Sequence, residues 1–293
     1  GGFKNQSKRF MPEISELGMV TDAEWADVNL DGYPDLVISQ DWGGILVFKN
    51  EQGRKLVKHE MVPGSEGLWA CLKPVDLDGD GDMDFIAGNM SLNSKIKASA
   101  EHPAYLQVGD FDKNGVVEQI ISCVTEDGKT YPMVLKGEMQ RALPMIKKNF
   151  IKYRDYANKT MEELFTVEQR EGSVIKKVTT TESSFLINDG KGNFSLVALP
   201  YQAQFSPIRA IETSDFDGDG HLDILLAGNF FDSLPEWGRF DANYGLLLKG
   251  LGKGKFKSIM SKDSGFRTRG QVRKMVAVKS VEKSIKWVLA KNN

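Results

Sequence analysis

The sequence has few of the residues that carry most catalytic and zinc chemistry. Its 293 residues include 2 cysteines and 3 histidines, so a disulfide framework is excluded, and no histidine cluster has the spacing of zinc ligands. A glycine-rich phosphate loop ending in Lys-Ser/Thr and a Gly-x-Ser-x-Gly nucleophile elbow are also missing. We interpret Cys71 and Cys123, both in apolar strand-like segments, as free thiols.

Long apolar runs and a dominant charge of one sign are missing as well. No segment approaches membrane-spanning length and the formal net charge is -2, so we expect neither a membrane span in this fragment nor a nucleic-acid surface. The hydrophobic fraction of 41% and the charged fraction of 27% are typical of a folded chain. The sequence opens Gly-Gly-Phe without Met, and we therefore expect a longer chain around it.

Aspartate, in contrast, recurs in a fixed pattern, Asp-x-Asp/Asn-x-Asp/Asn-Gly-x-x-Asp/Glu. The four copies span residues 27–35, 76–84, 110–118 and 215–223. Oxygen side chains at positions 1, 3, 5 and 9 suit Ca²⁺, which takes six to eight oxygen ligands, and glycine at position 6 permits the sharp turn. We predict up to four structural calcium ions, bound most tightly by the second and fourth loops, which carry carboxylates at all four positions.

The predicted metal ligands include two residues at position 7, where the backbone carbonyl is the donor. His221 is one of these two, and we interpret its side chain as a loop filler rather than a catalyst. The full predicted set is Asp27, Asn29, Asp31, Asp35, Asp76, Asp78, Asp80, Asp82, Asp84, Asp110, Asp112, Asn114, Glu118, Asp215, Asp217, Asp219, His221 and Asp223.

An EF-hand is the obvious competing interpretation of these loops. It requires a bidentate glutamate at position 12 and a helix on each side. Position 12 is apolar in all four copies: Ile38, Ala87, Ile121 and Leu226. Each loop runs into a short aliphatic segment that is typical of a buried strand. The loops are therefore predicted to connect strand to strand.

A hairpin pattern follows the loop-strand unit at 45–53, 185–194 and 246–256, so one repeat has four strands and corresponds to one propeller blade. Segment 3–10 resembles the second half of a hairpin, and 272–279 with 284–291 resemble two strands whose loop is reduced. If the first segment completes the last blade, the ring closes. We predict one all-β domain over 1–293, a β-propeller of about five four-stranded blades, with a fragment of a seven-bladed propeller as the alternative.

Two segments depart from this repeat. Between 84 and 105 the chain is too short for the two outer strands of the second blade. Within 137–165 the apolar residues are spaced at three and four positions, which predicts a small helical insertion with a capping box at Thr160 and Glu163. This insertion is rich in basic and aromatic residues. Two interpretations stay open: a solvated surface packed on the propeller, or a cap that binds a ligand or partner.

The loop, the strand after it and the Asn-Asp-Gly-x-Gly-x-Phe hairpin together resemble the FG-GAP/VCBS repeat, which is related to the calcium-binding blades of integrin α-chain propellers. Ala87-Gly-Asn89, Ala227-Gly-Asn229 and the stretch 238–241 resemble the C-terminal portion of large bacterial VCBS-repeat surface proteins. The resemblance implies an exported protein, extracellular or on the cell surface or outer membrane, with calcium in its blade loops.

The function expected from these features is a calcium-stabilised recognition or scaffold module that binds a glycan or protein partner at the cell surface without catalysis. Trp42, Trp237 and Arg239 in glycine-rich segments are candidate ligand-binding residues, whereas Trp25, Trp69 and Trp287 are predicted to be core. The alternative is a polysaccharide-active enzyme, a calcium-dependent lyase. Its candidate catalytic groups are Arg239, Tyr244, Lys97 and His102, which no spacing singles out.

Overall fold

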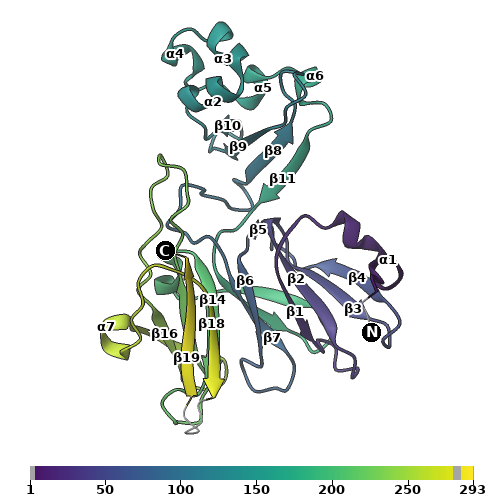
Figure 1. The fold of residues 1–293 in the computed structure, drawn as a ribbon, viewed down its shortest axis with the longest axis vertical. Coiled ribbons are helices and arrows are strands. Elements are labelled where there is room, and N and C mark those ends of the chain that lie inside the picture. Colours follow the sequence, from purple (N-terminus) through teal and green to yellow (C-terminus); the bar gives the residue numbers. More distant parts are fainter. Residues whose placement is uncertain (1–3, 280–284, 293) are drawn as a thin grey trace. The chain divides into compact units, whose positions relative to one another are not determined.

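The computed structural model describes residues 4–279 and 285–292, and the chain divides into two compact units. The first comprises Gly1–Lys95 and Thr181–Asn293, and the second is Ile96–Thr180 (Figure 1). Antiparallel sheets make up most of the structure, as an all-β, propeller-like fold requires. The sequence predicted an insertion at 137–165, and the structure extends the inserted part to 96–180 with strands of its own.

The first unit contains three sheets built on the predicted four-strand plan and a fourth of two strands. Figure 1 shows them as a series along this unit. In strand order the sheets are β1 (Met19–Ala26), β2 (Asp35–Gly43), β3 (Leu46–Asn50) and β4 (Leu56–Met61), with β5 (Gly67–Leu68) paired to β2; β6 (Cys71–Val75), β7 (Asp84–Gly88), β12 (Ser184–Asn188) and β13 (Phe194–Ala198); β14 (Ile208–Ser214), β15 (Asp223–Gly228), β16 (Leu246–Gly250) and β17 (Phe256–Met260); and β18 (Gln271–Lys279) with β19 (Ile285–Asn292).

The second sheet explains why its repeat looked too short. Its inner strands β6 and β7 precede the inserted unit, whereas its outer strands β12 and β13 follow it. Leu186 of β12 pairs with Phe85 of β7 in antiparallel register. The 185–194 hairpin therefore completes the second sheet, because β7 would otherwise be left with an unpaired edge.

Successive sheets of the first unit pack against each other through apolar side chains. Val37 and Val47 of the first sheet share a core with Phe85 and Leu186 of the second. Further clusters join the second sheet to the third and the third to β18–β19. The first strands of the sheets, β1, β6, β14 and β18, are successive neighbours. This is the arrangement of propeller blades around an axis.

The N-terminal segment does not form the predicted hairpin strand. It contains helix α1 (Ser7–Phe10) and the 3-10 helix η1 (Pro12–Glu16), and residues 1–3 lie outside the described part. Proline at the start of η1 has its φ preset for a helical turn and supplies no N–H for a strand ladder. Met11 and Leu17 pack on Leu36, Ile38 and Phe48 of the first sheet. The prediction that this segment completes the last blade is wrong, since it covers the first sheet instead.

The C-terminal prediction is confirmed, because 272–279 and 284–291 correspond to the antiparallel pair β18–β19, apart from the undescribed residues 280–284. Cys71 and Cys123 are free, as predicted. The glycine of Ala87-Gly-Asn89 is required by a close approach: a Cβ on Gly88 would lie 2.3 Å from the carbonyl oxygen of Ile208. Two short helices, η2 (Tyr201–Gln204) and α7 (Ser261–Ser264), complete the first unit.

The second unit has a different strand order, although it contains the third aspartate loop. Its sheet runs β10-β9-β8-β11, because the last strand pairs with the far side of β8 rather than extending the meander. The strands are β8 (Ala104–Gly109), β9 (Glu118–Val124), β10 (Thr130–Pro132) and β11 (Val174–Val178). The helices between β10 and β11 are α2 (Lys136–Ala142), α3 (Pro144–Asn149), α4 (Tyr153–Tyr156), α5 (Met161–Leu164) and α6 (Val167–Arg170).

The predicted helical character of this segment and its capping box are confirmed. Thr160 Oγ1 accepts the N–H of Glu163, and a Glu163 carboxylate oxygen accepts the N–H of Thr160. The apolar stripe of the helices, including Met139, Leu143 and Ile146, packs onto Phe111 and Ile120. Phe111 is position 2 of the third aspartate loop, so this core holds the loop against the helices.

Candidate metal centre

Hydrogen bonds from backbone N–H groups to side-chain carboxylates give all four aspartate loops the same shape. The carboxylate at position 1 accepts the N–H of the glycine at position 6, at 2.8 Å in the first and third loops, 3.2 Å in the second and 2.9 Å in the fourth. That glycine has φ between +83° and +93° in every loop, a conformation that other residues rarely adopt. The glycine therefore curls the loop around its first carboxylate.

The side chain at position 9 is the anchor of each loop. In the second loop Asp84 is buried, and its two oxygens accept the N–H groups of Leu77 at 3.0 Å and Asn188 at 2.8 Å. Asp35 and Asp223 make the corresponding pairs in the first and fourth loops. In these three loops one carboxylate thus joins position 2 of the loop to the third strand of its sheet, whereas in the third loop Glu118 accepts the N–H of position 2 alone, at 3.0 Å from Phe111 N.

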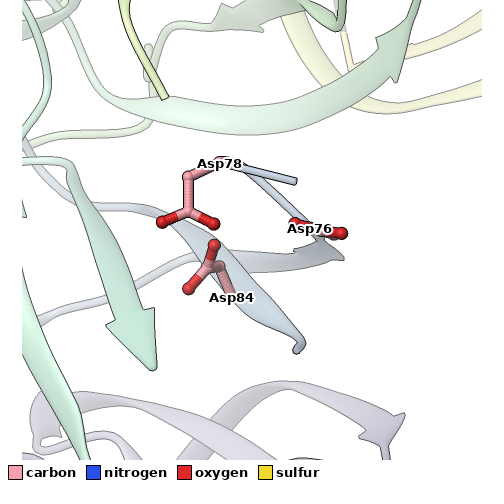
Figure 2. Close-up of side chains that lie close together, drawn as sticks. All are labelled: Asp76, Asp78 and Asp84. Atoms are coloured by element: carbon pink, nitrogen blue, oxygen red, sulfur yellow. The ribbon is translucent and has the colours of Figure 1, made fainter. Parts of the chain in front are cut away.

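Three loops bring carboxylates together. In the second, third and fourth loops the side chains at positions 1, 3 and 9 each place one oxygen within 4.8 Å of the other two. Figure 2 shows the three side chains of the second loop. The groups are Asp76, Asp78 and Asp84; Asp110, Asp112 and Glu118; and Asp215, Asp217 and Asp223. Such converging hard oxygens are the donor set that Ca²⁺ prefers. Exposed acidic groups often lie together without an ion, so proximity alone does not establish a metal site.

The first loop differs from these three. Asn29 replaces the acid at position 3, and its side-chain amide donates to a carboxylate oxygen of Asp31 at 3.0 Å. The structure describes every residue of this loop, and no three of its carboxylates come together. It folds like the others, but its three carboxylates do not converge as those of the other three loops do.

Unpartnered buried oxygens test whether a cation fits the groups. In the third loop, Asp112 Oδ1 and Glu118 Oε1 are buried and have no hydrogen-bond partner. In the second loop, Asp82 Oδ1 at position 7 is also buried without a hydrogen-bond partner. A buried carboxylate oxygen without a partner is costly, and a bound cation would remove that cost. The second and third loops therefore fit a hard cation.

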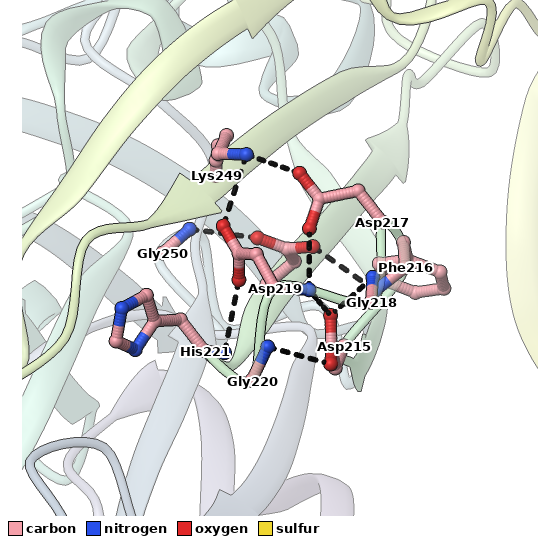
Figure 3. Close-up of polar contacts among 10 residues, drawn as sticks. Asp215, Phe216, Asp217, Gly218, Asp219, Gly220, His221, Lys249 and Gly250 are labelled. Atoms are coloured by element: carbon pink, nitrogen blue, oxygen red, sulfur yellow. Dashed lines mark hydrogen bonds and ion pairs between the residues drawn. The ribbon is translucent and has the colours of Figure 1, made fainter.

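The fourth loop already has a cation of its own. Lys249 of β16 places its ammonium group on the carboxylates of Asp217 and Asp219, the latter at 3.0 Å (Figure 3). These acids raise the pKa of Lys249, chiefly through their hydrogen bonds, and so favour its charged form. The equivalent residue in the second sheet, one before the Asn188 that donates to Asp84, is Ile187. The second loop therefore has no such competitor at this position, which the motif alone did not reveal.

We expect Lys249→Met to raise the calcium affinity of the fourth loop. The ion must displace an ammonium that makes two solvent-exposed ion pairs, which are weak, so the gain should be about 3- to 10-fold. Competition titration against a chromophoric chelator measures it, with the exposed Lys262→Met of α7 as the matched control. Equal affinities for the two variants would contradict competition by Lys249.

The crowded carboxylates predict an unusual pH dependence for the metal-free protein. Burial, with the charges of Asp80 and its neighbours, raises the pKa of Asp82 to about 6, and burial also raises the pKa of Asp84 and Glu118. When the folded pKa lies above the unfolded one, the stabilisation exists below the unfolded pKa and is lost as pH rises through the folded pKa. In EDTA the protein should therefore melt at a higher temperature at pH 5 than at pH 7.5.

Scanning calorimetry at the two pH values checks this dependence. Saturating calcium should reverse the order, because the ion binds the deprotonated carboxylates. Asp82→Asn serves as the matched variant and should reduce the difference seen in EDTA. A metal-free melting temperature that stays level or rises between pH 5 and pH 7.5 is the contradictory result.

The remaining predicted ligands lie outside the three groups. At position 5, Asp31, Asp80, Asn114 and Asp219 each use a side-chain oxygen to accept the N–H of position 7. The imidazole of His221 lies beside Gly252, where an added Cβ would come within 3.1 Å of Cε1. The side chains at position 5 therefore shape the backbone of the loop, and that of His221 fills space next to it.

The tryptophans are placed differently from the prediction in two cases. Trp42 lies in strand β2 with 8% of its surface exposed, so it is a buried residue rather than an accessible loop platform. Trp25, predicted to be core, is 56% exposed on β1. Trp69 is buried, as predicted, and Trp287, also predicted to be core, is partly buried and packs on Phe216. Burial of Trp42 follows from strand β2 extending to Gly43, which the glycine-rich sequence Asp-Trp-Gly-Gly concealed.

Trp237 lies partly exposed in a turn, and Arg239 is an exposed residue whose guanidinium lies 3.9 Å from the centroid of the Phe231 ring. Arg239 and Tyr244 belong to the first unit, whereas Lys97 and His102 belong to the second. The backbone N–H of His102 donates to Ser99 Oγ. None of these four residues lines the pockets formed within residues 131–159, 29–59 and 225–291.

Comparison with protein families matches residues 27–87 to the FG-GAP-like repeat. The matched segment begins at the first aspartate loop and ends in β7, directly after the second loop. No curated protein matches the chain. The segment is therefore an FG-GAP-like repeat, and with the antiparallel sheets it defines a β-propeller-like module with acidic groups suited to metal. A separate finding is that none of the described helices is long and apolar enough to cross a membrane.

Proposed function

We propose that this chain is a calcium-stabilised recognition or scaffold module of an exported bacterial protein, which binds a glycan or protein partner at the cell surface without catalysis. The observation that carries the proposal is the convergence of the carboxylates at positions 1, 3 and 9 in three separate loops. The FG-GAP-like repeat over the first two loops supports the same reading.

A structural role for the ion is supported by the position of the loops. Each lies between two adjacent strands of one sheet, and its ninth residue fastens it to a backbone N–H of the loop itself. A cation bound there would neutralise acids that otherwise repel each other and would stabilise the folded state by mass action. The ion would act on stability, and binding of a partner would occur at other surfaces.

Export to a calcium-rich compartment is supported by the composition of the loops. Extracellular calcium modules bind at about 10⁻⁴–10⁻³ M, and the second loop, with five aspartates over 76–84, has the charge for that range. The resemblance to bacterial VCBS-repeat surface proteins supports the same location. Three groups of residues would each hold one ion: Asp76, Asp78 and Asp84; Asp110, Asp112 and Glu118; and Asp215, Asp217 and Asp223. A fourth, weaker site would use Asp27, Asn29, Asp31 and Asp35.

Calorimetric titration of metal-stripped protein with CaCl₂ tests the proposal. We expect three sites, with a fourth weaker one at the first loop, and tightest binding at the second loop. MgCl₂ is the control and should bind more weakly, because Mg²⁺ demands octahedral geometry and keeps its waters. The proposal fails if fewer than two calcium ions bind.

A further inference from the structure

The second unit contains a pocket that the metal loops do not use. It has a volume of about 720 Å³ and is lined by residues 131–138 together with Arg141, Tyr153, Arg154 and 156–159. These come from β10, the turn after it, α2, α4 and the segment that follows α4. Pockets of about 300–1,000 Å³ are typical of sites for small ligands. The size therefore favours a small or oligomeric ligand over the flat surface of a folded partner.

A buried ammonium group lies in the wall of this pocket. Lys136 is 5% exposed, and its Nζ lies 5.0 Å from the centroid of the Tyr153 ring. Its hydrogen-bond acceptors are neutral and distant: the side-chain oxygen of Gln140 at 3.5 Å and the carbonyl oxygen of Ile151 at 3.3 Å. No ion pair to Lys136 is found among the described residues. A buried charge without a counter-ion is costly, so an anion entering the pocket would be favoured.

The surface around Lys136 combines positive charge with an exposed aromatic ring. Between residues 136 and 159 the sequence has seven Lys or Arg residues and two acidic ones. Arg141 and Arg154 line the pocket with largely exposed side chains, and each forms an exposed ion pair, with Glu138 and Asp155 respectively. Tyr153 is 68% exposed. A ring surface beside cations suits a ligand that has both an apolar ring face and an anionic group.

We infer that this pocket binds an acidic oligosaccharide, whose sugar ring stacks on Tyr153 and whose carboxylate or sulfate group pairs with Lys136 and the neighbouring arginines. The inference rests on the proposed recognition function and gives it a site and a ligand class. An extended acidic peptide is the less favoured occupant. The sheet edge beside the pocket is β10, only three residues long, and Pro132 removes one of its N–H donors, so it is a poor template for strand addition.

Calorimetric titration of the full chain at fixed calcium tests this inference with four probes. Tetragalacturonate carries carboxylates, a heparin-derived tetrasaccharide carries sulfates, maltotetraose is neutral, and a tetraglutamate peptide is the acidic non-sugar. We expect one or both acidic sugars to bind at least 10-fold more tightly than maltotetraose and the peptide, and whichever binds identifies the anion. Raising NaCl from 50 to 500 mM should weaken that binding, since charge is screened.

Three variants assign the binding to the pocket. Tyr153→Ala should weaken the acidic sugar at least 10-fold, whereas Tyr201→Ala, which removes a tyrosine of similar exposure (70%) from the first unit, should leave it unchanged. Lys136→Met keeps the length of the buried side chain and should abolish the preference for acidic over neutral sugar. Because Tyr153 is exposed, its variant keeps the test valid even if Lys136→Met fails to fold.

The remaining outcomes either overturn the inference or separate it from the role of calcium. It is wrong if the peptide binds better than the sugars, if maltotetraose binds as tightly as the acidic sugars, or if none of the probes binds. An acidic sugar that binds equally to the Tyr153→Ala variant would leave the recognition function standing and remove this site. If calcium fails to stabilise the fold while the Tyr153-dependent binding persists, the calcium role falls and the site stands.

Discussion

Chelation of calcium with EDTA should lower the melting temperature of this protein by about 10 °C or more. At a free calcium concentration of 100 times Kd, each site adds about 2.7 kcal/mol to the free energy of unfolding. The first unit holds two of the carboxylate groups and the second unit one. One kcal/mol shifts the melting temperature by about 2–4 °C in a domain of 150–250 residues and about 4–8 °C in one of 60–100 residues, so both units should respond.

Scanning calorimetry at rising CaCl₂ concentration, with and without EDTA, measures this effect. Because the chain has two compact units, two transitions are expected, and each should move with calcium. Asp112→Asn is the matched control, because it alters the group in the second unit and should reduce the shift of that transition alone. A thermogram that is the same in calcium and in EDTA would show that the loops fold without a metal.

The second large effect is a contrast between two aspartates of the same group. Asp84→Ala should destabilise the first unit by about 2–6 kcal/mol in EDTA, because it leaves the N–H groups of Leu77 and Asn188 without an acceptor, each at about 1–3 kcal/mol. Asp78 is exposed, and its hydrogen bond to the N–H of Asp80 is 3.2 Å long. Asp78→Ala should therefore change the metal-free stability by less than about 0.5 kcal/mol.

The two variants should behave alike toward calcium and differently without it. Each removes one carboxylate from the group, so each should reduce the stabilisation that calcium provides. Urea unfolding in EDTA and in saturating CaCl₂ gives the four free energies that are needed. Equal destabilisation of the two variants in EDTA would show that position 9 is a ligand and nothing more.

Local features of the sequence predicted the loops and the elements next to them. The spacing of oxygen side chains around Gly32, Gly81, Gly115 and Gly220 predicted the curled loops, and the apolar runs after them predicted strands. These predictions succeeded because a loop of nine residues closes on itself: the carboxylate at position 1 accepts the backbone N–H of position 6 in all four loops. Turn chemistry predicted the hairpins for the same reason.

Pairing between distant segments was harder to predict. The sequence did not show that β12 and β13 complete the second sheet after the insertion 96–180. The partner of β7 depends on which strand reaches its free edge in the folded protein, and local sequence does not record this. The sequence predicted a strand over residues 3–10, whereas the structure has α1 and η1 in this part of the chain, packed on the first sheet. A short segment that mixes apolar and basic residues has too few positions for its periodicity to distinguish a strand from a helix. Burial of Trp42 depends on neighbours that no local pattern records.

The sequence by itself determined the repeated acidic loops, the β-strands that flank them and the helical character of the insertion, since each of these depends on residues close together in the chain. The tertiary structure alone decided which carboxylates converge, that Lys249 lies on two acids of the fourth loop, and that Lys136 is buried beside Tyr153 without an acidic partner among the described residues. Charge and burial act through space, so these features depend on folded distances that the order of residues does not state.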